Sequence, residues 1–166
     1  MEDLRVKSYQ VQPDNWTDNA KLLRPIITGR KSDILPVHVK FRLEELYRSF
    51  IFENWLSVVS LSRSMLEYAI LDNCHKWDIQ PKYKVTYPRE EDRDKDLKTL
   101  IEEISQHEKG LFRPMDSVRD TGNQVIHPKK TKMSKATLFE RRELARKCIE
   151  DLTHSIEVLY LPKEES

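Results

Sequence analysis

The sequence has little glycine, few cysteines and no long apolar run. Three glycines among 166 residues are far below ordinary usage and argue against a turn-rich β fold. No stretch approaches the roughly 20 apolar residues that a membrane span requires. The first residues, MEDLR, lack the apolar core of a signal peptide. We therefore expect a cytoplasmic protein with no membrane association.

The two cysteines, Cys74 and Cys148, are far apart and form no CxxC pattern. This indicates a reducing compartment rather than a disulfide or a metal site. The chain also has no glycine loop that could cradle a phosphate and no nucleophile elbow, so kinase, hydrolase and redox functions of the familiar types have no support. We expect no metal ion and no other cofactor.

What the chain does contain is enough apolar sequence for one core. Hydrophobic residues make up 38% and charged residues 34%, with a formal net charge of +1. The length suits a single domain. Proline and glycine interrupt the first part of the chain at Pro13, Pro25 and Gly29, where helical periodicity is weak. Residues 1–35 are therefore predicted to form an irregular N-terminal arm that packs on a domain formed by residues 36–166.

Apolar periodicity predicts five helices in that domain, at about residues 38–52, 54–77, 95–107, 114–127 and 134–160. The fourth must end at His127, because Pro128 disfavours helical geometry in the residue before it. The charge run at residues 89–96 is predicted to be a solvated loop that leads into the third helix. The predicted fold is an all-α bundle of four to five helices with an irregular N-terminal arm.

A charged pair stands on the apolar side of the second predicted helix. On a helical wheel, Arg63 and Glu67 fall inside an arc that also contains Leu56, Leu66 and Ile70. Burying a charge without a partner is expensive, so both side chains need partners. The pair is either a structural ion pair or part of a polar pocket inside the bundle, and the wheel does not distinguish these two interpretations.

The fourth predicted helix carries a polar stripe. Arg119, Asn123 and His127 follow one another at four-residue steps and therefore share one face. Gly122 lies in the same segment and costs about 1 kcal/mol of helix stability relative to alanine. We therefore expect another backbone or a ligand to approach closely there. His127 stands at the negative end of the helix dipole, which favours its protonated form.

The near-zero net charge conceals a basic region around this stripe. Residues 109–135 contain seven basic and two acidic residues, whereas residues 89–108 contain four basic and eight acidic ones. Lys129, Lys130 and Lys132 are the candidate nucleic-acid-binding residues. Taken one at a time, a capping histidine, a hydrogen-bonding asparagine and solvated lysines are ordinary structural features. Together with Arg119, these side chains are of the types that cleave RNA without a metal ion. A guanidinium can bind a phosphate with two hydrogen bonds, and an imidazole can move a proton near neutral pH.

Several stretches resemble the HEPN superfamily (higher eukaryotes and prokaryotes nucleotide-binding). The resemblance is to the branch, described as a domain of unknown function, that is often attached to restriction-endonuclease subunits. It covers about residues 35–161 and rests on four matching stretches and the closing helix. The stretches are residues 35–39 (LPVHV), 43–46 (LEEL), 62–69 (SRSMLEYA) and 120–127 (DTGNQVIH).

This resemblance implies a helical bundle that pairs across a symmetric interface and acts in a defence or toxin–antitoxin setting. Many members of the superfamily are metal-independent endoribonucleases, whose hallmark is an arginine, a polar residue directly after it, and a histidine further on. Asp120 supplies that polar residue here, but seven residues separate Arg119 from His127. This spacing is longer than the hallmark, so Arg63 on the neighbouring helix is a second candidate for the guanidinium.

Two classes of function follow. In the enzyme hypothesis, His127 moves protons at the 2′-hydroxyl or the leaving oxygen, Arg119 or Arg63 stabilises the charge on phosphorus, and Asn123 orients the histidine or the phosphate. A homodimer would then supply both an acid and a base. In the alternative, the chain is a non-catalytic module that binds RNA, a nucleotide or a protein such as an antitoxin, or only dimerises. The near-neutral net charge favours the alternative.

Overall fold

The computed structural model describes residues 13–27, 35–85, 91–126 and 137–160. Within these ranges the protein is an α-helical bundle with one small β-hairpin, which confirms the all-α prediction. Short 3₁₀ helices, η2 (Cys74–Trp77) and η3 (Lys109–Leu111), follow the third and fourth helices. The α-helices are α1 (Pro13–Ile27), α2 (Val37–Ile51), α3 (Trp55–Asn73), α4 (Leu97–His107), α5 (Phe112–Ile126) and α7 (Leu138–Tyr160).

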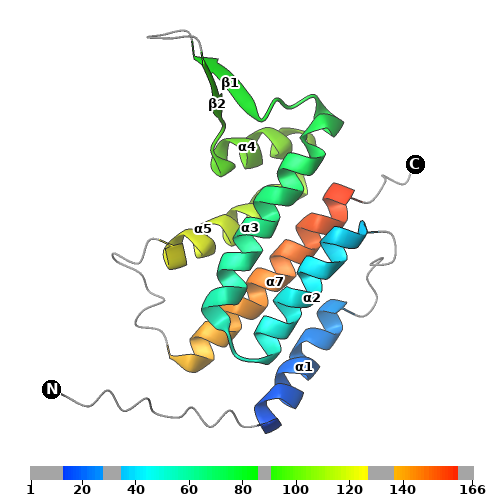
Figure 1. Cartoon of the computed structure of the whole chain (residues 1–166), viewed down its shortest axis with the longest axis vertical. Coiled ribbons are helices and arrows are strands. Elements are labelled where there is room, and N and C mark those ends of the chain that lie inside the picture. The colour runs from blue at the N-terminus through cyan, green and yellow to red at the C-terminus, as the bar shows by residue number, and fades with distance from the viewer. Residues whose placement is uncertain (1–12, 28–34, 86–90, 127–136, 161–166) are drawn as a thin grey trace, which may run out of the picture.

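Helix α3 forms the centre of the bundle, because it packs against α2, α5 and α7. In the view of Figure 1, α7, α2 and α1 follow one another to the right of α3, and α5 extends to its left. The α3 side chains that carry this packing include Val58, Val59, Leu66 and Ile70, all of which are fully buried. The apolar character of α3 on several sides therefore reflects contacts with helices on several sides.

The apolar stripe predicted for the last helix is confirmed over most of its length. Ala145, Cys148, Ile149, Leu152, Ile156 and Leu159 are buried in α7. Two further members of the predicted stripe differ, because Leu138 is 70% exposed and Leu144 is 37% exposed. Burial raises the pKa of the Cys148 thiol to about 12 and also raises the pKa of the Cys74 thiol. Both thiols are therefore inert parts of the core at neutral pH.

The prediction of an irregular N-terminal arm is wrong for residues 13–27, which form α1. Leu23 and Ile26 are buried, and the amide of Asn19 donates a hydrogen bond to the carbonyl oxygen of Ile51 on α2 (3.3 Å). Pro25 lies inside the last turn of this helix, where it removes one backbone hydrogen bond. Packing of the apolar face against α2 and α7 offsets that loss, which a local reading of proline does not anticipate.

Part of the segment predicted to be a solvated loop forms a β-hairpin. Strands β1 (Lys82–Val85) and β2 (Glu91–Asp94) pair antiparallel, and Figure 1 shows them projecting beyond α4. The register places Lys82 opposite Asp94 and Lys84 opposite Asp92. Oppositely charged cross-strand neighbours stabilise a ladder, so the charge run supports a strand pairing instead of preventing it.

Two helix starts carry side-chain caps that fix where the chain enters the bundle. Asp96 accepts a hydrogen bond from the backbone N–H of Thr99 at the start of α4 (2.8 Å). Thr137 and Glu140 form a reciprocal capping box at the start of α7, with contacts of 2.7, 2.9 and 3.2 Å. The capping box explains why α7 begins at Leu138 rather than near residue 134 as predicted.

Among the described residues, no helix combines the length and the apolar character that crossing a membrane demands.

Candidate functional site

The predicted Arg63–Glu67 pair forms, and it is joined to a second helix. The Arg63 Nη1 lies 3.3 Å from Glu67 Oε2 one turn further along α3. The Arg63 Nε–H donates a hydrogen bond to Asn123 Oδ1 on α5 at 3.0 Å. The Arg63 side chain is 25% exposed and that of Glu67 is 44% exposed. The guanidinium is therefore oriented by two helices while one side of it still reaches solvent.

Gly122 is the reason that α3 and α5 come so close. A Cβ atom at this position would lie 2.5 Å from Arg63 Cβ, 2.7 Å from Cδ and 2.9 Å from Cγ. The sequence predicted a close approach by a backbone or a ligand at Gly122. The structure identifies the approaching group as the aliphatic part of Arg63. The missing side chain thus makes room for the arginine that Asn123 then holds.

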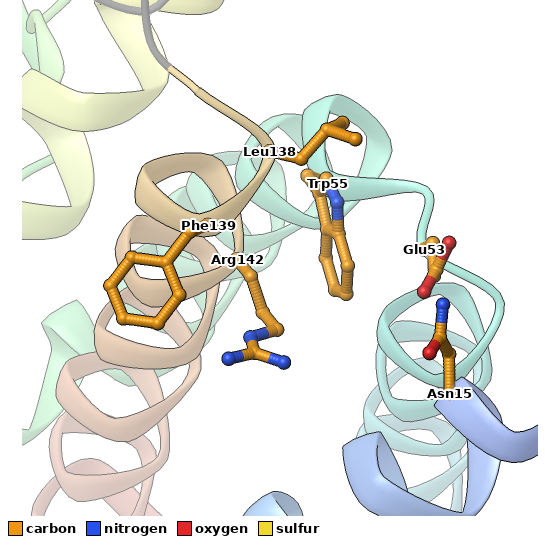
Figure 2. A pocket seen from close by; sticks show the side chains of 6 residues that line it. All are labelled: Asn15, Glu53, Trp55, Leu138, Phe139 and Arg142. Carbon is orange, nitrogen blue, oxygen red and sulfur yellow. The ribbon is translucent and has the colours of Figure 1, made fainter.

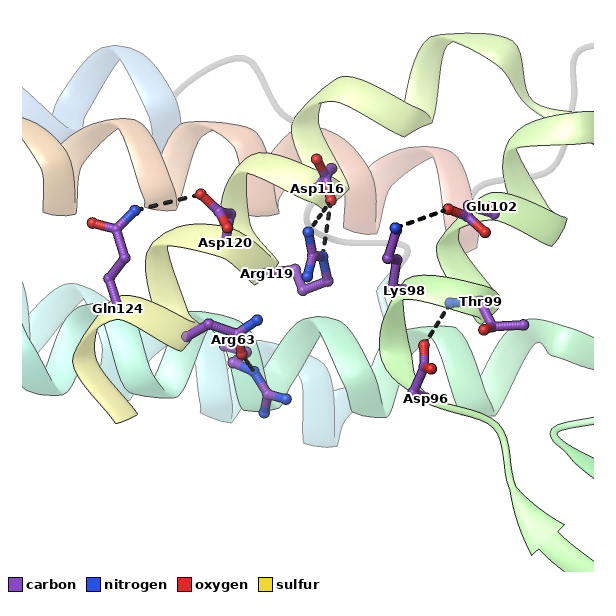
Figure 3. Close-up of polar contacts among 10 residues, drawn as sticks. Arg63, Asp96, Lys98, Thr99, Glu102, Asp116, Arg119, Asp120 and Gln124 are labelled. Atoms are coloured by element: carbon purple, nitrogen blue, oxygen red, sulfur yellow. Dashed lines mark hydrogen bonds and ion pairs between the residues drawn. The ribbon is translucent and has the colours of Figure 1, made fainter. Parts of the chain in front are cut away.

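Arg119 forms an ion pair with a residue on its own helix, α5. Its Nη2 lies 2.7 Å from Asp116 Oδ1, and its Nε–H donates to the same oxygen at 2.8 Å. Figure 3 shows Arg119 on α5 turned toward Asp116, with Arg63 on α3 at a separate place. The Arg119 side chain is only 18% exposed. Within the described residues, no hydrogen bond or ion pair links Arg119 to Asn123 or Arg63.

Of the remaining predicted site residues, one is exposed and the others lie outside the described residues. Asp120 is exposed and accepts a long hydrogen bond from Gln124 Nε2 at 3.4 Å, on the face shown in Figure 3. His127, Lys129, Lys130 and Lys132 lie outside the described residues. The structure therefore brings Arg63, Glu67 and Asn123 together and keeps Arg119 and Asp120 apart from them.

The strengths of the two arginine contacts differ. Arg119 meets one carboxylate oxygen with two nitrogens at 2.7 and 2.8 Å, which is the usual range for a strong charge-assisted bond. Arg63 meets Glu67 with one nitrogen at 3.3 Å, which is longer than that range. Among the residues that the structure describes, none accepts a hydrogen bond from Arg63 Nη2. Arg63 is thus held to its carboxylate partner by a longer contact than Arg119 is.

Sequence reasoning missed two polar partners. Asp116 stands three residues before Arg119, and this spacing was the available signal, because i,i+3 pairs face each other on a helix.

A second group of polar contacts joins α7 to α2 and α3. The Tyr160 hydroxyl donates to Asp72 Oδ2 at 2.8 Å, and His38 Nε2 lies 4.0 Å from the same oxygen. Burial raises the pKa of the Tyr160 phenol. No spacing in the sequence could reveal a contact among three helices.

No three or more histidine, cysteine, aspartate or glutamate side chains gather as a possible metal site in the described ranges.

Comparison with known proteins returned no match to any family model, any curated protein or any solved structure.

Proposed function

We propose that this chain is an RNA-directed protein of the HEPN type, with Arg63 as the phosphate-binding group. The observation that carries the proposal is the hydrogen bond from Arg63 on α3 to Asn123 on α5. It puts a partly exposed guanidinium beside the helix stripe on which Asn123 precedes His127 by four residues. An arginine that is already oriented loses less conformational freedom when it clamps a phosphate.

Glu67 does not prevent this role. Its contact with Arg63 is long and its carboxylate is nearly half exposed, so a phosphate oxygen can replace it on the guanidinium. Asn123 is a neutral partner that uses the Nε–H, which leaves the two terminal nitrogens for an anion. The basic residues Lys129, Lys130 and Lys132 would add attraction for the RNA backbone.

The activity to be tested at this site is RNA cleavage without a metal ion. In that reaction His127 removes the proton from the 2′-hydroxyl or protonates the 5′-oxygen that leaves, and Arg63 stabilises the negative charge on the phosphoryl oxygens. The 2′-oxygen attacks phosphorus, and the bond from phosphorus to the 5′-oxygen breaks. Because one histidine serves only one of the two proton transfers at a time, we propose a homodimer that contributes two copies of the stripe.

A non-catalytic role is the second candidate, and the Arg119–Asp116 pair favours it. Two short contacts hold the Arg119 guanidinium to its own helix, so the chain presents one available arginine at this site instead of two. In this role the same site binds RNA, a nucleotide or a protein partner and releases no product. Both candidates are cytoplasmic and fit a defence or toxin–antitoxin setting in which a partner protein controls the chain.

The test uses a short fluorescein-labelled single-stranded RNA of mixed sequence, with EDTA present. We expect RNA binding, and Arg63→Gln should weaken it about tenfold, because hydrogen bonds to charged groups contribute about 1.5–3 kcal/mol. Arg146→Gln is the matched control. Arg146 also pairs with a glutamate four residues later, at 3.7 Å, and is 34% exposed. Equal RNA affinity of the Arg63 variant and the wild type would contradict the proposal.

His127→Ala separates the two candidate roles. Loss of cleavage with retained RNA binding supports the endoribonuclease, whereas RNA binding without any product from the wild type supports the non-catalytic module. Cleavage that persists in the alanine variant would contradict catalysis by His127.

A further inference from the structure

A pocket lies at the N-terminal end of α3. It has a volume of about 230 Å³ and opens where α1, the turn between α2 and α3, and the start of α7 meet. Figure 2 shows the side chains that line it. They are Asn15, Glu53, Trp55, Leu138, Phe139 and Arg142. This volume is below the range of about 300–1,000 Å³ that is usual for ligand pockets, so the pocket suits a small ligand such as one substituted ring.

Local structure fixes the walls of this pocket. The Thr137–Glu140 capping box sets the start of α7, which places Leu138 and Phe139 at the pocket. Trp55 is 6% exposed and its ring packs against the edge of Phe50, with 4.9 Å between the ring centroids. The pocket is therefore built on helix ends held by caps and core packing.

The walls are apolar and partly uncovered. Leu138 is 70% exposed and Phe139 is 63% exposed, although both are large hydrophobic residues. Covering such side chains is favourable in proportion to the apolar area removed from water. A ligand with a flat apolar body would gain this contribution from Leu138, Phe139 and Trp55.

Arg142 is the cationic side chain of the pocket lining, and it is 31% exposed. Its Nε is buried, and it has no hydrogen-bond acceptor among the described residues. The nearest carboxylate oxygen recorded for it is Oε1 of Glu143 at 3.8 Å, which is beyond hydrogen-bond distance. The guanidinium lies over the Phe139 ring, 5.3 Å from the centroid. Because the Nε is closed off from solvent, a carboxylate in the pocket would bind the terminal nitrogens of this 31% exposed side chain, which the ring already orients.

The pocket carries the opposite charge on its other side. In Figure 2, Arg142 lies on one side of the Trp55 side chain, and Glu53 and Asn15 lie on the other. Glu53 has a backbone φ of 64°, in the left-handed region that non-glycine residues seldom adopt. The turn thus holds a glutamate in an unusual conformation at the pocket edge, and its carboxylate is an acceptor for a cationic group.

We propose that this pocket binds a small zwitterion with a flat apolar body, its carboxylate on Arg142 and its ammonium group on Glu53. The body lies across Trp55, which stands between Arg142 and Glu53 in Figure 2, and the Asn15 amide is a further hydrogen-bonding group at the cationic end. This site is separate from the proposed RNA site and requires nothing from it.

The test uses para-aminomethylbenzoate, which has a carboxylate and an ammonium group at opposite ends of one ring. Nitrogen-15 NMR of the tryptophan indole groups follows binding, since Trp55 lines the pocket and Trp77 lies beyond the other end of α3. We expect the Trp55 signal to shift with a dissociation constant on the order of 1 mM, as is typical of a ligand this small. The Trp77 signal should stay in place. Absence of a Trp55 shift would overturn the proposal.

Matched ligands and variants test the carboxylate end and the ammonium end of the zwitterion separately. Para-ethylbenzoate lacks the amine and para-aminomethylbenzamide lacks the carboxylate, and each should bind about tenfold more weakly. Arg142→Gln should weaken the zwitterion about tenfold and leave the benzamide unchanged, whereas Arg146→Gln should change neither. Equal binding of all three ligands by the wild type would overturn the proposal without relying on any variant.

Discussion

Arg63 on α3 and Asn123 on α5 are joined by a hydrogen bond of 3.0 Å, directly beside the place where Gly122 lets the two helices approach. The three residues form one unit. The glycine provides the space, the arginine fills it with its aliphatic part, and the asparagine holds the guanidinium. This unit fixes how α5, which carries the polar stripe, lies on the central helix of the bundle.

Gly122→Ala tests how closely α3 and α5 approach each other at residue 122. Alanine favours the helix by about 1 kcal/mol relative to glycine. Its Cβ would lie 2.5 Å from Arg63 Cβ, an atom next to the backbone that cannot swing away, and overpacking of this kind costs about 1–3 kcal/mol. We expect the overpacking to dominate and the free energy of unfolding to fall by up to about 2 kcal/mol in urea titrations followed by circular dichroism.

Gly110→Ala is the control for that variant. A Cβ at Gly110 would have no atom within 4 Å, so this substitution should be neutral or should stabilise by up to about 1 kcal/mol. A Gly122→Ala variant as stable as Gly110→Ala would show that α3 and α5 are not packed as described.

A double-mutant cycle tests the Arg63–Asn123 hydrogen bond. We expect Arg63→Met and Asn123→Ala to show a coupling free energy of about 1 kcal/mol, which is the usual contribution of a partly buried hydrogen bond. The exposed Asp120–Gln124 contact at 3.4 Å provides the comparison. Its coupling, measured with Asp120→Ala and Gln124→Ala, should stay below about 0.5 kcal/mol. Two cycles with the same value would argue that the inter-helix bond is not formed.

Asp96 makes the stability of α4 depend on pH. The backbone N–H of Thr99 lowers the pKa of the Asp96 carboxyl below its ordinary value of 3.8. A lowered pKa means that the cap contributes fully above this ordinary value and is lost as the pH falls through the lower, folded-state pKa. Asp96→Ala should reduce the free energy of unfolding by about 1 kcal/mol at neutral pH and by less in strong acid.

Asp96→Asn is the control for that prediction, because asparagine caps a helix without titrating. Its stability relative to the wild type should rise as the medium becomes strongly acidic. A pH-independent difference between wild type and Asp96→Ala would contradict the assignment of the cap to the ionised carboxyl.

The cysteines should resist modification in the folded protein. Burial raises the pKa of Cys148 to about 12 and also raises that of Cys74, so almost no thiolate forms at neutral or mildly alkaline pH. We expect a thiol-specific disulfide reagent to label neither residue in buffer and both in urea, as measured by mass spectrometry. Rapid labelling of Cys148 in buffer would show that α7 is not packed against the core as described.

The helices were predictable where their signals are local. The spacing of Cys148, Ile149, Leu152 and Ile156 was sufficient to predict the buried face of α7, because a 3.6-residue period places them on one side of a helix. The same local reasoning was wrong for α1, where Pro25 indicated an interruption. Packing of Leu23 and Ile26 against the bundle stabilises the helix despite the proline. The sequence predicted that this segment packs on the body, but it did not predict that the segment is helical.

The candidate site also contains some contacts that were predictable from local spacing and others that depend on the packing of whole helices. The four-residue spacing of Arg63 and Glu67 predicted their pairing, and the glycine at position 122 predicted a close approach. Which group approaches could not be predicted, because residues 63 and 122 meet only after α3 and α5 have crossed. For the same reason, the common face of Arg119 and Asn123 did not ensure common contacts, since Arg119 bonds to Asp116 on its own helix.

The sequence by itself determined the helical class, the apolar faces and the charge pairs within a helix, because these depend on residues that are neighbours along one chain segment. Only the tertiary structure decided that the Arg63 guanidinium bonds to Asn123 on a second helix, and that Asn15, Glu53 and Arg142 line one pocket. These relationships join distant segments, and the packing of whole helices sets their geometry.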